Sequence, residues 1–289
     1  MSGLERAPRG LLALSIASFL LLYWPILRRL VADWMNDDNY SHGFFIIPIA
    51  AYFAWERRGV VAALPVKPTN IGMVVVLGGL GMLLAGLLGA ELFISRVSLI
   101  VVLAGGVLFV AGWRWLAALA FPVGFLILMI PIPAIIFNQI AFPLQLLASR
   151  VGEAVLYAMS VPVLREGNIM ILANTTLEVA EACSGIRSLI SLLTLGIVYG
   201  YFTTPRAGLR LLIALATIPI AIVANAGRVA GTGVAAHFYG PEAAQGFFHT
   251  FSGWLVFLAA FFLLFAVTRI LLRLAPRSPL PQPAAAGAN

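Results

Sequence analysis

The stretch Pro68–Ala90, PTNIGMVVVLGGLGMLLAGLLGA, decides the fold class of this chain. It contains no Lys, Arg, Asp or Glu, and it is long enough to cross the hydrocarbon core of a bilayer, which takes roughly 17–25 apolar residues in a helix. Similar uncharged runs precede and follow it along most of the sequence. The sequence therefore predicts an all-α integral membrane protein with about eight transmembrane helices. The predicted spans are 10–27, 39–55, 70–90, 97–113, 115–131, 184–203, 210–228 and 250–272.

The composition of the 289-residue chain excludes an ordinary soluble domain. Hydrophobic residues make up 62% of the chain and charged residues only 10%, whereas about a quarter of a soluble domain is charged. The net charge of +7 does not indicate nucleic-acid binding. Lys and Arg stand singly or in pairs between the apolar runs, as they do at the ends of membrane helices, so we interpret them as an orientation signal.

The segments between the spans add a few smaller features. Proline removes a backbone donor and clashes with the preceding turn, so Pro131-Ile132-Pro133 should end a span. The residues that follow, about 137–160, are expected to form a helix on or near the membrane surface. Two β-rich stretches between 163 and 180 flank the turn signal Ala173-Asn174-Thr175-Thr176, with another turn signal at Glu166-Gly167-Asn168, and predict a small hairpin. The predicted organisation is one polytopic membrane domain over 1–275 and a disordered tail, rich in Pro and Ala, over 276–289.

Basic residues predict the orientation of the spans. With the N-terminus in the cytoplasm, the larger share of Lys and Arg falls on the cytoplasmic side, as the positive-inside rule requires. The pair Arg28-Arg29, just after the first span, disagrees with this assignment. Both termini are therefore predicted to be cytoplasmic. Three longer segments, 28–43, 131–182 and 228–246, then lie on the outer side, and they carry most of the acidic residues.

Cys183, the single cysteine of the chain, is the first candidate for chemistry. It lies in Glu181–Ser188, EACSGIRS, where an outer segment leads into the sixth predicted span. A helix start favours a thiolate through its unpaired amides and its dipole, and Arg187, one turn further on, adds a cation. A lowered thiol pKa is what a cysteine nucleophile needs. The alternative is that Cys183 is a small apolar filler in a membrane helix.

Arg228 is the second candidate, at the outer end of the seventh predicted span. Its guanidinium cannot act as a base at neutral pH, but its fork of donors can hold a carboxylate or a developing oxyanion. Asn225, one turn earlier, is placed to orient the arginine or a substrate. The alternative for Arg228 is an interfacial arginine that extends towards the lipid headgroups.

His249 is the third candidate, at the outer start of the eighth predicted span. Histidine is rare in an apolar run, and its pKa suits general acid–base catalysis. The alternative is an interfacial histidine in an aromatic belt. His237 in the same outer segment competes for the role, and His42 lies in another outer segment.

These candidates agree in their predicted position. The topology places Cys183, Arg228 and His249 at the outer ends of three consecutive spans, and helices joined by short turns tend to be neighbours. A nucleophile, an oxyanion donor and a proton carrier together make an acyl-transfer site. No cofactor is called for, and no Cys/His cluster has the spacing of a structural metal site.

Four ordered segments carry a resemblance to a known family. The segments 181–188, 225–229 and 248–254 resemble the three signature regions of the exosortase/archaeosortase family, and 34–55 is similar to its N-terminal signature. The resemblance implies a membrane-embedded cysteine protease or transpeptidase that acts like a sortase. It assigns Cys183 as the nucleophile, Arg228 as the oxyanion or substrate clamp and His249 as the general acid–base, and that histidine points to the bacterial branch. The supporting candidates are Arg187, Asn225, Glu181 and His42.

The resemblance also implies partners and a location. Substrates would be exported, membrane-anchored proteins of the PEP-CTERM kind, whose C-terminal signal combines a Pro-Glu-Pro-like motif, a membrane helix and a basic end. Cleavage through a Cys183 thioester would transfer the protein to an acceptor, or to water, at the periplasmic face of the bacterial inner membrane. Arg165 or Arg187 could receive the glutamate of the motif. The acceptor, the exact motif, the exosortase subtype and the oligomeric state stay open.

Two other functions are consistent with a polytopic membrane protein. One is a non-catalytic membrane component of a polysaccharide export system, in which Cys183 would only pack. The other is a transporter, but the predicted spans contain almost no charge, whereas transporters of ions and polar solutes usually place charges near the bilayer midplane. Clustering of the candidate groups at one interface favours chemistry on a membrane-anchored substrate.

Overall fold

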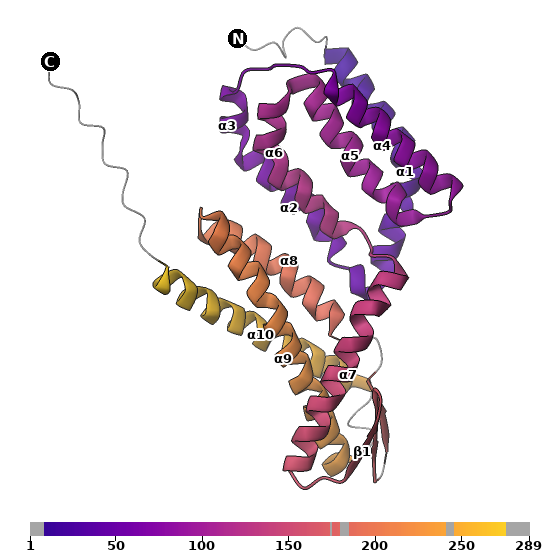
Figure 1. Ribbon diagram of the computed structural model, residues 1–289, viewed down its shortest axis with the longest axis vertical. Helices are drawn as coiled ribbons and strands as arrows, with labels where there is room; N and C mark the ends of the chain where they lie inside the picture. The colour runs from indigo at the N-terminus through magenta and orange to yellow at the C-terminus, as the bar shows by residue number, and fades with distance from the viewer. Residues whose placement is uncertain (1–8, 174, 180–184, 241–245, 276–289) are drawn as a thin grey trace, which may run out of the picture. The chain divides into compact units, whose positions relative to one another are not determined.

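The computed structural model describes residues 9–173, 175–179, 185–240 and 246–275 (Figure 1). The chain divides into two compact units, Met1–Phe137 and Asn138–Asn289. Almost all of the described residues are helical, with one small sheet in the second unit. The prediction of an all-α integral membrane protein is thereby confirmed.

The first unit consists of helices joined by short turns. Its α4 and α5 lie side by side, and the two helices are joined by only three residues (Figure 1). The tight turn ends at Glu91, whose side chain accepts a hydrogen bond from the Phe93 amide and thereby caps α5. The elements are α1 Arg9–Asn36, η2 Asp38–Tyr40, α2 Gly43–Glu56, α3 Arg58–Ala63, α4 Ile71–Leu88, α5 Leu92–Ala111, α6 Trp113–Phe125 and η3 Leu126–Met129.

Glycines set the close approach of α4 and α5. Gly72, Gly79 and Gly86 recur every seven residues on α4 and all face α5. A Cβ added at Gly72 would lie 2.2 Å from the backbone nitrogen of Phe109, and one at Gly86 would lie 2.3 Å from Ser95 Oγ. Small residues let helix backbones approach in a membrane, where there is no hydrophobic force between helices to hold them together. This row of glycines therefore determines the α4–α5 contact.

The second unit begins at Asn138, within α7, and a small sheet follows this helix (Figure 1). The sheet is antiparallel in the order β1-β2-β3, with Glu166 opposite Ile169 and Met170 opposite Leu177. Gly167, at φ +65°, supplies the left-handed conformation of the β1–β2 turn. The predicted hairpin is present, and a third strand extends it. The elements are α7 Ala134–Ala158, β1 Val163–Glu166, β2 Ile169–Leu172, β3 Thr176–Glu178, α8 Ile186–Thr203, α9 Ala207–Tyr239 and α10 Gly246–Leu274.

One face of the sheet packs on α7 and α9. The Ser149 hydroxyl on α7 donates to the Gly167 carbonyl at 3.0 Å, and Arg165 Nε on β1 donates to Glu153 Oε2 on α7 at 2.7 Å. Burial of apolar side chains between these elements removes them from water and holds the sheet in place. The buried residues of this cluster are Ala148, Leu156, Val161, Met170, Leu172, Val179 and Val229.

Within the described residues, seven helices are long and apolar enough to cross a membrane, close to the predicted count of about eight. They are α1, α4, α5, α7, α8, α9 and α10. The count includes α7, for which the sequence predicts a surface helix. It omits α2, which has 14 residues, and the shorter apolar segment Trp113–Met129. Pro131 and Pro133 fall between η3 and α7, where the sequence predicts an interruption, and the tail 276–289 lies outside the described residues.

Candidate active site

The three helices that carry the predicted motifs pack on one another in the second unit. Leu192 of α8, Ile213 and Ala221 of α9, and Leu264 of α10 belong to one buried cluster. Figure 1 shows α8 and α10 running beside α9. The sequence expectation that these consecutive spans are neighbours therefore agrees with the described packing.

Gly185 connects the first motif to the second. It precedes the first residue of α8 in the left-handed conformation, at φ +79°, which L-residues with a side chain rarely adopt. It also packs directly against Asn225 of α9, since a Cβ at Gly185 would lie 2.6 Å from Asn225 Cγ. Asn225 is buried, with 5% of its surface exposed. Both the backbone conformation and the space therefore require glycine at this position.

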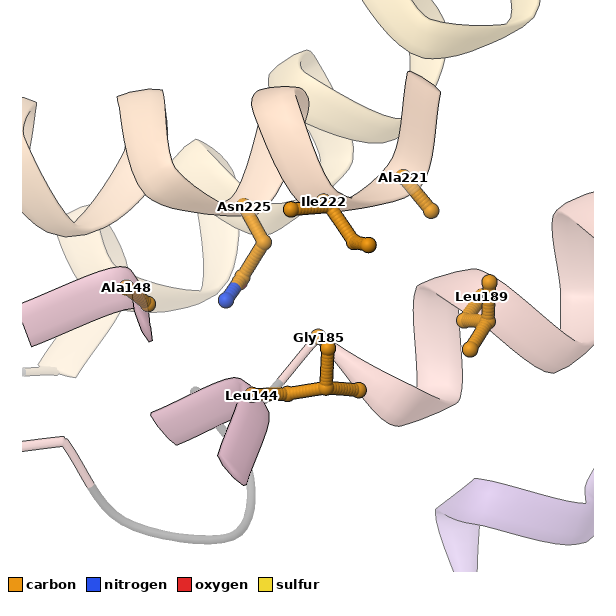
Figure 2. Close-up of a pocket in the computed structure, with 7 residues that line it drawn as sticks. All are labelled: Leu144, Ala148, Gly185, Leu189, Ala221, Ile222 and Asn225. Atoms are coloured by element: carbon orange, nitrogen blue, oxygen red, sulfur yellow. The ribbon is translucent and has the colours of Figure 1, made fainter. Parts of the chain in front are cut away.

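A small cavity lies beside this contact (Figure 2). Its volume of about 10 Å³ is close to the minimum that holds one water molecule. Asn225 projects towards Gly185 and, among the described residues of the lining, supplies the only side-chain polar group. An amide in this position can bind a water or a backbone group at the start of α8. The lining residues are Leu144, Ala148, Gly185, Leu189, Ala221, Ile222 and Asn225.

Arg228 connects the second motif to the third. It lies three residues after Asn225 on α9 and is half-buried. Its guanidinium lies against Gly253 of α10, where an added Cβ would be 3.3 Å from Nη2 and 3.4 Å from Cζ. His249 lies four residues before Gly253, in the first turns of α10. One turn of helix therefore separates His249 from the residue that contacts Arg228.

The other predicted site residues are placed less completely. Cys183 and Glu181 lie outside the described residues, as does the side chain of His249. Arg187 is half-buried in the first turn of α8. His237 lies in the last turn of α9. The described contacts bring together Gly185 with Asn225 and Arg228 with Gly253, one pair for each junction between the three motifs.

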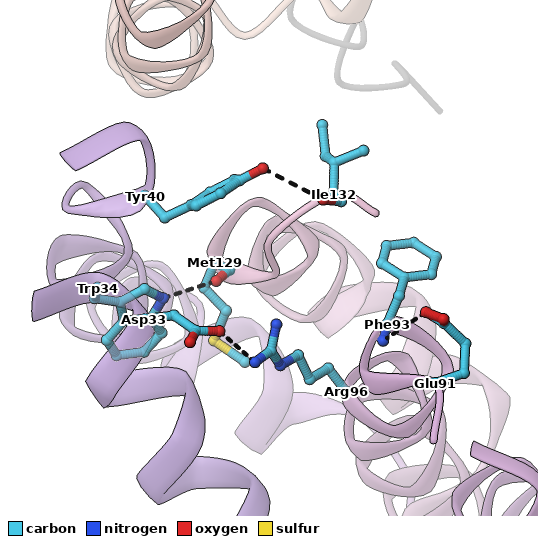
Figure 3. A network of polar contacts seen from close by, with 8 residues as sticks. All are labelled: Asp33, Trp34, Tyr40, Glu91, Phe93, Arg96, Met129 and Ile132. Atoms are coloured by element: carbon cyan, nitrogen blue, oxygen red, sulfur yellow. Dashed lines mark hydrogen bonds and ion pairs between the residues drawn. The ribbon is translucent and has the colours of Figure 1, made fainter. Parts of the chain in front are cut away.

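The N-terminal signature region lies in the first unit and forms a separate polar network (Figure 3). Trp34 Nε1 donates to the Met129 carbonyl at 2.9 Å, and the Tyr40 hydroxyl donates to the Ile132 carbonyl at 3.4 Å. His42 Nε2 lies 3.1 Å from the Leu128 carbonyl oxygen. These bonds tie the segment before α2 to the end of η3 and the turn after it. The described contact of His42 thus lies within its own unit.

Sequence reasoning missed the ion pair between Asp33 and Arg96, which Figure 3 shows at the centre of this network. Asp33 lies near the end of α1, and Arg96 lies in α5 with only 4% of its surface exposed. The signal for this pair in the sequence was that two residues of opposite charge each lie next to an apolar run. No group of three or more His, Cys, Asp or Glu side chains that could hold a metal occurs among the described residues.

Comparison with protein families gives one match, to a family described as transmembrane exosortase, over residues 34–266. The matched range begins at Trp34 and contains all four segments on which the resemblance rests. It covers well over half of the chain and includes parts of both units. The comparison with curated proteins gives no match. The comparison with solved structures gives none either.

Proposed function

This chain belongs to the transmembrane exosortase family, and on that premise we propose that it cleaves and transfers membrane-anchored proteins through a cysteine thioester. Family membership supports a membrane-embedded, sortase-like transpeptidase in general. The finer assignment gives Cys183 the role of nucleophile, Arg228 that of oxyanion donor and His249 that of general acid–base. The enzyme would lie in a bacterial inner membrane with its site facing the periplasm.

The observation that carries this proposal is the pair of contacts that joins the three motifs. Asn225 packs on Gly185, and Gly185 follows Cys183 by two residues in the sequence. On the next turn of α9, Arg228 packs on Gly253, one turn from His249. The proposal assigns a nucleophile, an oxyanion donor and a proton carrier to the three motifs that these contacts join.

In the first half-reaction, the Cys183 thiolate attacks the carbonyl carbon of the scissile peptide bond. A C–S bond forms, and the carbonyl π electrons move to the oxygen, where the Arg228 guanidinium stabilises the negative charge. When the oxyanion collapses, the C–N bond breaks and the His249 imidazolium gives its proton to the leaving amine. The products are an acyl thioester on Cys183, a neutral His249 and the released C-terminal segment.

In the second half-reaction, an acceptor nucleophile or water attacks the thioester carbon. His249 takes the proton of the nucleophile, and the C–S bond breaks to restore the thiolate and the imidazolium. A substrate anchored by a membrane helix, with a Pro-Glu-Pro-like motif at the outer interface, would present its scissile bond at the level of this site.

The test is processing of a signal-bearing substrate in cells that express the parent chain, Cys183→Ala or Ser191→Ala. Ser191 lies on α8, which follows Cys183 in the sequence, and it is half-buried, so Ser191→Ala is the control for removal of a small side chain. We expect processing to stop only in Cys183→Ala, and a substrate conjugate on Cys183 to be detectable by mass spectrometry in the parent. Unchanged processing by Cys183→Ala, at equal expression, would instead support the non-catalytic role in polysaccharide export.

A further inference from the structure

A second cavity lies in the first unit, between the later part of α1 and the start of α5. Its volume is about 90 Å³, enough for several water molecules or one small anionic group. Two of its lining residues are arginines, one is a serine and the rest are apolar. The lining residues are Pro25, Ile26, Arg29, Leu87, Leu92, Ser95 and Arg96.

Arg96 is the more buried of the two arginines that line this cavity. Only 4% of its surface is exposed, and one Nη nitrogen donates to Asp33. Its Nε is buried as well, yet it has no hydrogen-bond partner among the described residues. A buried charged donor that lacks an acceptor is costly, and a guanidinium can serve two acceptors along different edges of its fork. Because Nε is buried rather than exposed to the cavity, a second oxygen ligand reaches it only after a small shift of the guanidinium or of its surroundings.

The charged groups around the cavity differ in whether their side chains already have a partner. Arg29 is exposed and has no ion-pair partner within the described part of the chain, while Asp33 is the only carboxylate paired with Arg96. The Glu91 carboxylate caps its own helix by accepting from the Phe93 amide, and the Ser95 hydroxyl donates to the Glu91 carbonyl. Asp33, Glu91 and the Ser95 donor are thus already engaged, and within the described part of the chain Arg29 is left as the charge at the cavity that can pair with an added anion.

We propose that this cavity binds a phosphate group carried by a phospholipid headgroup. Phosphate oxygens match the guanidinium fork, which is why arginine is favoured at phosphate sites. Leu87 and Leu92 are exposed beside the arginines and provide apolar surface for the lipid chains. The site gives a function to Arg29, one of the two basic residues that disagree with the positive-inside assignment. It lies on the side of the membrane predicted to be periplasmic.

The test uses the purified full chain in dodecyl maltoside and measures its thermal unfolding during titration with dioleoyl phosphatidylglycerol. Dioleoylglycerol, which has the same chains and no phosphate, controls for apolar binding, and sodium phosphate against sodium chloride at equal ionic strength tests free phosphate. The variants are Arg29→Gln and Arg28→Gln. Arg28 is also exposed and adjacent in sequence but does not line the cavity, so it matches Arg29 in charge and position.

We expect phosphatidylglycerol to raise Tm in the parent and in Arg28→Gln, with no effect of dioleoylglycerol. Loss of a charge-assisted hydrogen bond in Arg29→Gln should weaken the apparent affinity about tenfold or more. An Arg29-dependent shift of equal size with sodium phosphate would assign the site to free phosphate and overturn the lipid source. Equal behaviour of the two variants, an equal effect of dioleoylglycerol, or no shift in the parent would overturn the site itself.

Discussion

The guanidinium of Arg228 on α9 lies against the Cα of Gly253 on α10, so closely that an added Cβ would be 3.3 Å from Nη2. This distance is tighter than ordinary van der Waals contact, and the arginine would have to move by a few tenths of an ångström to admit a methyl group. Gly253 is therefore a contact residue of Arg228 as well as a part of an apolar helix. The lack of a side chain at this position gives the cation of the proposed site room to pack against α10.

Gly253→Ala should lower the activity of the chain without lowering its stability. Alanine has the higher helix propensity, by up to about 1 kcal/mol, so the unfolding free energy of the chain should stay the same or rise. Displacement of Arg228 should nevertheless lower the processing rate about threefold to tenfold, since a misplacement of 1 Å can cost about 100-fold. The measurements are substrate processing in membranes and thermal unfolding in detergent.

Gly231→Ala is the control for this change. Gly231 is an exposed helical glycine on α9, one turn after Arg228, and no described atom lies within 4 Å of a Cβ placed there. We expect it to process substrate at the parental rate. If Gly253→Ala and Gly231→Ala behave alike, the Arg228–Gly253 contact has no part in the reaction.

The helices and the hairpin could be predicted because each depends on local sequence. Uncharged runs of sufficient length and the Gly167-Asn168 turn signal need no knowledge of distant residues. The contact between Arg228 and Gly253 could not be predicted in this way, because a glycine in an apolar run can serve packing, bending or neither. Only the packing of α9 on α10 assigns it a role.

The Asp33–Arg96 pair escaped prediction for a similar reason. Both charges border apolar runs and look like ordinary interfacial residues in the sequence. Glu91 caps α5, so this helix begins at Leu92, five residues before the predicted start at residue 97. Arg96 therefore lies inside the helix rather than ahead of it. A side chain expected at the membrane surface is therefore buried, and tertiary packing alone supplies its counterion.

Gly185→Ala should destabilise the chain through two separate effects. The left-handed backbone disfavours a Cβ by roughly 1–2 kcal/mol, and that Cβ would also collide with Asn225 at 2.6 Å. Gly167→Ala has a similar positive φ but no neighbour within 4 Å among the described atoms, so it carries the backbone cost alone. We expect a clearly lower Tm for Gly185→Ala than for Gly167→Ala. Equal losses would show that the Asn225 contact is not formed.

Asp33→Asn should destabilise the first unit because it leaves the buried Arg96 cation without its counterion. The cost is expected at about 1–3 kcal/mol, below that of a fully buried pair, since the Asp33 side chain is 39% exposed. Glu56→Gln removes an exposed carboxylate from the same unit and should change stability by less than about 0.5 kcal/mol. Denaturant unfolding in mixed micelles measures both, and a neutral Asp33→Asn would contradict a structural role for the pair.

The glycine row on α4 provides the sharpest test of the described helix packing. Gly72→Ala places a Cβ 2.2 Å from the Phe109 backbone nitrogen, and backbone cannot rotate away, so α4 and α5 must separate at a cost of about 1–3 kcal/mol. Gly78→Ala and Gly81→Ala lie on the same helix with no described atom within 4 Å and should leave Tm unchanged or slightly raised. Thermal unfolding of the three variants distinguishes contact glycines from the others. A Gly72→Ala variant as stable as Gly78→Ala would mean that α4 does not present this face to α5.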